Sequence, residues 1–84
     1  MKIDEDSINS AFDELLQIFE ELAEAEDVVN ELKTELESYK PVSPKRAEVQ
    51  LKLDEAERNR IKIARKYVKA QMKVDRIKTL MRLV

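Results

Sequence analysis

Acidic side chains form the densest cluster in this sequence that could do chemistry. Glu20, Glu21, Glu24 and Asp27 fall within about two turns of a helix. Carboxylate oxygens are the ligands that Mg²⁺ prefers, and a bound Mg²⁺ could polarise a phosphate for hydrolysis. Acids that point outward from a helix are more commonly just solvated, and this is the interpretation we favour.

The order Glu20-Glu21-Leu22-Ala23-Glu24 resembles one half of the magnesium-binding motif of the all-α nucleotide pyrophosphatases. That resemblance would imply a Glu-x-x-Asp half on a later helix. Leu51 stands three positions before Asp54, and Met72 stands three positions before Asp75, so this second half is missing. We therefore predict no metal site, no cofactor and no small-molecule substrate.

Several residue types that catalysis relies on are absent from the chain, which has no His, Cys, Trp or Gly. Without His and Cys there is no Ser-His or Cys-His nucleophile pair and no zinc cluster. Without Gly there is no phosphate-cradling loop. The sequence therefore predicts a protein that is not an enzyme.

The N-terminus and the lack of Cys bear on location. Residues 1–6 are mostly charged, whereas a secretory signal has a basic start followed by an apolar run. No stretch approaches the roughly 20 apolar residues of a membrane span. With no Cys for disulfides, we expect a soluble, intracellular protein of the cytoplasm.

Charge divides the chain into two halves. Residues 1–43 carry a net charge of −10 and residues 44–84 carry +8, although the whole chain carries only −2. Such halves need counter-charges in the same chain, in a second copy, in a partner protein or in a polyanion. The asymmetry therefore predicts an interaction protein.

The basic half offers a candidate binding surface for a partner protein or for a nucleic-acid backbone. Binding to phosphates would tolerate any sequence and would weaken steeply with salt. A membrane-surface role for residues 61–84 is disfavoured because the apolar spacing described next already accounts for their apolar side. The candidate binding residues are Arg58, Lys62, Arg65, Lys66, Lys69, Lys73 and Arg76.

The spacing of apolar residues predicts a long coiled-coil helix over about 44–84. A seam of residues there alternates in steps of four and three. Arg60 is its one polar member. Its stem could lie along the seam with the guanidinium at the helix edge, or the guanidinium could fix the register against a carboxylate. The seam is Val49, Leu53, Ala56, Arg60, Ile63, Tyr67, Ala70, Val74, Ile77, Met81 and Val84.

The first half predicts a second amphipathic helix over about 5–39, with one irregularity. Two consecutive steps of three, from Phe19 to Leu22 to Ala25, interrupt the rhythm. Such a stammer overwinds a supercoil locally. The expected seam is Ile8, Phe12, Leu15, Phe19, Leu22, Ala25, Val29, Leu32, Leu36 and Tyr39.

The junction at residues 40–43 predicts a short turn. Pro41 disfavours helical geometry at Lys40, so the first helix should end near Tyr39. Ser43 suits the N-cap position and Pro44 the first helical position of the next helix. So short a link makes the helices antiparallel neighbours. We therefore expect an all-α fold, with residues 1–84 forming one helical-hairpin domain.

Apolar residues beside the second seam predict self-association. Ile61, Ala64 and Val68 widen the apolar side of this helix beyond what one antiparallel neighbour covers. They are the candidate oligomer interface of a four-helix or larger bundle. The expected function is a non-catalytic assembly protein that docks a partner through charged faces. The alternative is an oligomeric accessory protein that holds nucleic-acid backbone, of the kind that assists recombination or replication.

Overall fold

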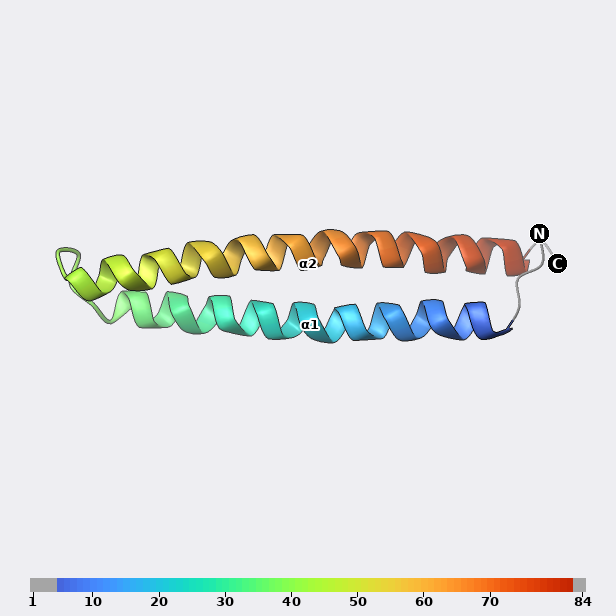
Figure 1. Cartoon of the computed structure of the whole chain (residues 1–84), viewed down its shortest axis with the longest axis horizontal. Coiled ribbons are helices and arrows are strands. Elements are labelled where there is room, and N and C mark those ends of the chain that lie inside the picture. The colour runs from blue at the N-terminus through green and yellow to red at the C-terminus, as the bar shows by residue number, and fades with distance from the viewer. Residues whose placement is uncertain (1–4, 83–84) are drawn as a thin grey trace.

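Two long helices account for nearly all of residues 5–82, which are the residues that the computed structural model describes. Helix α1 spans Glu5–Glu37 and helix α2 spans Pro44–Arg82. They lie side by side in opposite directions, with the connecting turn at one end of the molecule (Figure 1). The molecule measures 62 × 14 × 14 Å. The prediction of an all-helical hairpin is therefore confirmed.

Local sequence explains why the two segments are helical. Both are rich in Ala, Leu, Glu, Lys and Arg, which are strong helix formers, and neither contains Gly. Glu5 and Asp6 lie in the first turn of α1, where negative charge complements the helix dipole, and Arg82 lies in the last turn of α2. The two Pro residues stand outside the helix interiors.

The first helix ends at Glu37, slightly before the predicted end near Tyr39. The backbone and hydroxyl of Ser38 both donate hydrogen bonds to the carbonyl of Glu35, and the Tyr39 N–H donates to the carbonyl of Leu36. These bonds span three residues rather than four, so they tighten the last turn and lead the chain out of the α-helix.

Arg46 ties the two helices together at the turn. Its Nη1 atom donates to the Tyr39 carbonyl at 3.0 Å and to the Leu36 carbonyl at 3.4 Å. These carbonyls lie in the last turn of α1 and just beyond it, where acceptors lack partners within the helix and a cation is favourable. Helix α2 begins at Pro44, as predicted, and this start places Arg46 within reach.

The seam of α2 is confirmed over most of its length. Met81, near its end, is more than half exposed, and Val84 lies outside the described residues. The other seam residues, from Val49 to Ile77, are buried or half-buried. The fully buried residues of α2 are Val49, Leu53, Ala70 and Val74.

The seam of α1 differs from the prediction. Phe12 and Phe19 are 40% and 54% exposed, while Ala11 is buried and Ile18 half-buried in their place. The steps of three and four then run without interruption, so the predicted stammer is wrong. A small residue at Ala11 lets the two backbones approach closely, and a Phe ring would hold them apart. The observed seam is Ile8, Ala11, Leu15, Ile18, Leu22, Ala25, Val29, Leu32, Leu36 and Tyr39.

The core of the hairpin is narrow. Its buried side chains in residues 5–82 are only Ala, Val and Leu. The accessible surface is 6965 Å², whereas a compact monomer of 9.9 kDa exposes about 5,200 Å². A single hairpin therefore leaves far more surface in water than a globular chain of this size.

Candidate interaction surfaces

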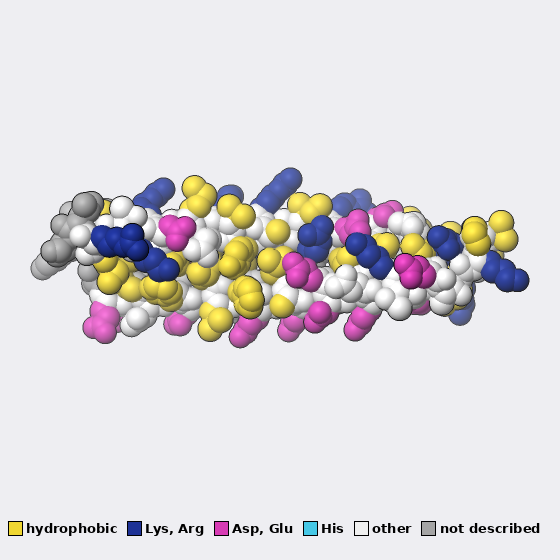
Figure 2. Space-filling model, turned by 180° about the vertical axis from the view of Figure 1, so that it is seen from behind, with side chains coloured by type: hydrophobic (Ala, Val, Ile, Leu, Met, Phe, Trp, Pro, Cys, Tyr) yellow, Lys and Arg dark blue, Asp and Glu magenta, His cyan; other side chains and the backbone are white. Residues whose placement is uncertain are grey.

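Six apolar residues from both helices lie on one side of the hairpin. Each stands one or four residues after an inward-facing residue of the seam, which places it on the flank of its helix. We call this surface the apolar face. Figure 2 shows apolar side chains gathered over both helices in the half of the hairpin away from the turn. The face consists of Phe12, Leu16, Phe19, Ile61, Ala64 and Val68.

An aromatic contact joins the α1 part of the apolar face to the seam of α2. The rings of Phe19 and Tyr67 lie with their centroids 6.1 Å apart and their planes tilted by 48°. Tyr67 belongs to the seam of α2, so this contact also fixes the relative height of the two helices. A shallow cleft beside it is lined by Phe12, Leu15 and Leu16 among others.

The predicted interface residues of α2 are left uncovered by α1. Ile61 is 42% exposed and Val68 is 55% exposed, while Ala64 is half-buried. The prediction did not include the contribution of α1, because it had placed Phe12 and Phe19 in the seam. Their outward position makes the exposed apolar surface wider than the residues of α2 alone would make it.

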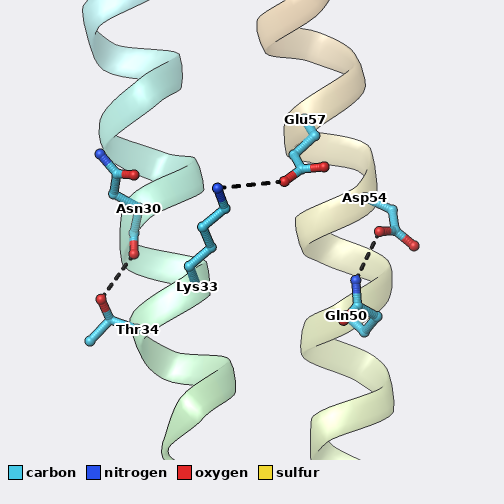
Figure 3. A network of polar contacts seen from close by, with 6 residues as sticks. All are labelled: Asn30, Lys33, Thr34, Gln50, Asp54 and Glu57. Carbon is cyan, nitrogen blue, oxygen red and sulfur yellow. Dashed lines mark hydrogen bonds and ion pairs between the residues drawn. The ribbon is translucent and has the colours of Figure 1, made fainter.

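Polar contacts replace apolar ones on the same side nearer the turn. The Nζ atom of Lys33 lies 3.9 Å from Oε1 of Glu57, which bridges the two helices (Figure 3). Beside this pair, Nε2 of Gln50 donates to Oδ1 of Asp54 at 2.9 Å. Along this side, the exposed residues of both helices are therefore apolar in the half away from the turn and polar nearer the turn. The apolar face ends where these polar contacts begin.

Arg60 is half-buried within the seam, at the boundary between these two regions. It lines a cleft with Glu26, Val29 and Lys33, and it forms no ion pair with a described residue. This environment fits the first alternative, in which the stem follows the seam and the guanidinium reaches the helix edge. The ion pair required by the second alternative is not formed within residues 5–82.

The candidate basic residues are all exposed on α2, and one of them contacts α1. The Nζ atom of Lys73 lies 3.7 Å from Oε2 of Glu14, on the side of the hairpin away from the apolar face. An exposed pair of this kind contributes about 0.2–1 kcal/mol. No ion pair with a described residue is formed by the other six, which are Arg58, Lys62, Arg65, Lys66, Lys69 and Arg76.

The outer edges of the hairpin carry opposite charges. Along α1 the outward residues Asp13, Glu20 and Asp27 form an acidic edge, and along α2 Arg58 and Arg65 form a basic edge. Figure 2 shows Asp and Glu gathered mainly along one edge and Lys and Arg along the other. Because the edges face away from each other, they do not neutralise each other within one molecule.

The acidic cluster of α1 lies on the surface of the hairpin. Glu20, Glu21, Glu24 and Asp27 are all exposed, and no group of three or more residues able to hold a metal ion is found in residues 5–82. Within the same range, neither helix is apolar enough over a sufficient length to span a bilayer.

Comparison with known proteins gives no relative for this chain. No protein-family model, no curated protein and no solved structure matches it.

Proposed function

We propose that this protein is a non-catalytic helical hairpin that self-associates and uses its charged edges to dock a partner protein. The apolar face carries this proposal. Its large side chains come from both helices, and Leu16, Phe19 and Val68 are each more than half exposed. Apolar surface gathered in this way is typical of an interface between proteins.

Stability supports self-association for a second reason. A two-helix core of Ala, Val and Leu buries little surface, and chains of this size commonly need an additional source of stability. Covering the apolar face with another copy would complete a four-helix bundle, in which each helix has neighbours on two sides. Oligomerisation would thus stabilise the helices and remove the exposed aromatic rings from water.

The charged edges suit the docking of a partner protein. Complementary charge accelerates association and selects among partners, even where it adds little to affinity. The acidic residues of α1 suit a basic partner, and the basic residues of α2 suit an acidic one. A partner with both kinds of surface could contact both edges of the assembled bundle.

Light scattering coupled to size-exclusion chromatography tests self-association. At tens of micromolar we expect a molar mass of at least twice the 9.9 kDa of the chain. The mass should persist in high salt, because the apolar contacts that hold the copies together are not screened by ions. A mass equal to that of one chain at this concentration would contradict the proposal.

Nucleic-acid binding is a second candidate function, favoured by the exposed cations of α2 that have no ion pair within residues 5–82. Lys62, Lys66 and Lys69 lie on the side opposite the apolar face and remain accessible when that face is covered. They could contact successive phosphates in any sequence. The chain would then act as an assembled accessory protein on nucleic acid.

Titration of a fluorescent oligonucleotide at low and high salt tests this second candidate. If the protein binds nucleic acid, its affinity for the oligonucleotide should fall steeply as the salt concentration rises. Replacement of Lys62, Lys66 and Lys69 by Glu should abolish the binding. Lys40 and Lys45, which are exposed near the turn, provide a control variant with Glu at both positions. If the unaltered protein does not bind at low salt, the nucleic-acid function is excluded.

A further inference from the structure

We propose that the occupant of the apolar face is a second copy whose turn lies at the same end, with α1 of each copy packed on α2 of the other. This inference rests on the proposed self-association and specifies its geometry. Two identical hairpins that meet face to face have two symmetric arrangements. The two-fold axis runs either along the length of the hairpins or across it.

The two arrangements differ in which helices become neighbours. An axis along the length keeps the two turns together and sets α1 on the α2 of the second copy. An axis across the length separates the turns and sets α1 on the second α1, and α2 on the second α2. In both arrangements the same apolar side chains are covered, so hydrophobic burial does not choose between them.

The charged edges distinguish the two arrangements. With the axis across the length, the acidic edge of one copy borders the acidic edge of the other, and the two basic edges also meet. Juxtaposed like charges disfavour an interface. With the axis along the length, each acidic edge borders a basic edge. Charge therefore favours the arrangement in which the turns lie together.

Individual residues match in height along the hairpin. The contact of Phe19 with Tyr67 sets Glu20 level with Arg65, and both point toward the outer edges of the hairpin. With the axis along the length, Glu20 of one copy meets Arg65 of the other at the rim of the interface. Seven residues further toward the turn on each helix, Asp27 and Arg58 match in the same way.

The apolar residues match in the same manner. Leu16 on α1 and Val68 on α2 stand at nearly the same height, so each would pack against the other across the interface. The charged pairs then flank a strip of apolar contacts, as charged residues flank the seam of a coiled coil. Symmetry repeats each of these contacts on the other side of the axis.

The hairpin has enough surface to form such an interface. It exposes 6965 Å², which exceeds the value for a compact chain of its mass by about 1,800 Å². A stable interface of standard size buries about 800 Å² on each partner. The surplus surface of the hairpin is therefore larger than the area that a stable dimer needs to bury on each copy.

A distance measurement between turns tests the arrangement. Val42 in the turn is 91% exposed, and the chain has no Cys, so Val42→Cys gives a unique position for a spin label. We expect pulsed electron resonance to give a distance of about 20–30 Å, which corresponds to two or three helix diameters. Turns at opposite ends would be separated by about the molecular length of 62 Å.

The outcomes separate this inference from the proposed function. A dimer with a long distance between labels overturns the arrangement and leaves self-association standing. A monomer overturns both. Light scattering on the labelled protein distinguishes these two results, because the long-distance dimer still has twice the chain mass.

Charge reversal at the rim tests the residue pairing independently. Glu20→Arg and Arg65→Glu should each weaken the dimer about tenfold or more, because each variant sets like charges together twice per dimer. An equimolar mixture of the two variants should recover the unaltered affinity, because the heterodimer restores both pairs. Glu24→Arg and Lys69→Glu, which change the same charges at positions away from the interface, should have little effect. A mixture that stays as weak as its components overturns the pairing.

Discussion

Replacing both Ile61 and Val68 by Ser should weaken self-association about a thousandfold. The two residues are 42% and 55% exposed in the hairpin, so about half of each side chain is still available for burial. Burial of that half contributes about 1 kcal/mol for each residue. A symmetric dimer buries four such side chains, and about 4 kcal/mol corresponds to about a thousandfold in affinity. Sedimentation equilibrium over a range of concentrations measures this change.

Matched variants separate loss of the interface from a general loss of apolar surface. Val28 and Leu80 are 46% and 37% exposed and lie on the side of the hairpin opposite the apolar face. Their replacement by Ser removes a similar amount of apolar area, yet it should leave the dimer intact. Ser and Val have similar helix propensities, so circular dichroism in the cold should show helix in all variants. An unaltered mass for the Ile61 and Val68 double variant would show that another surface joins the copies.

The architecture was predictable because several local signals agree. The two Pro residues, the absence of Gly and the spacing of apolar residues all indicate two helices separated by a short turn. The seam of α2 was predictable because its alternation of four and three runs unbroken from Val49 onward, even across the polar Arg60. In α1 the pattern offered a choice, because the predicted seam that uses Phe12 and Phe19 breaks this alternation once.

The two Phe residues show how that choice failed. The predicted seam contained the two large residues Phe12 and Phe19, whereas the observed seam contains their neighbours Ala11 and Ile18. The distance between two closely packed helices instead favours the smaller residue. The sequence did hold a signal for this outcome, because only the path through Ala11 and Ile18 keeps the alternation of three and four unbroken.

This difference changes the candidate interface as well as the core. With the aromatic rings outside the seam, α1 contributes Phe12, Leu16 and Phe19 to the apolar face, whereas the prediction had drawn the face from α2 alone. Contacts between the helices were less predictable still. The pairs of Glu14 with Lys73 and of Arg46 with the end of α1 depend on the relative height of the helices, which the sequence of neither helix specifies alone.

Leu53→Ala should lower the free energy of unfolding by about 3 kcal/mol, the typical cost of emptying a buried Leu position. Leu53 is 5% exposed in the seam of α2. For a chain of this size the loss corresponds to a fall of about 12–24 °C in the melting temperature. Urea unfolding at one fixed protein concentration measures the change, since an associating chain is more stable when concentrated.

Leu51 provides the comparison that makes this measurement a test of the seam. It lies two positions before Leu53 and is 70% exposed. Leu51→Ala should therefore change the free energy of unfolding by less than about 0.5 kcal/mol. The two variants have the same composition, and their helix propensities and unfolded chains are nearly identical. The difference between them therefore reports burial of the side chain and little else. Equal losses in the two variants would mean that α2 packs through a different side, and the apolar face would then have to be redrawn.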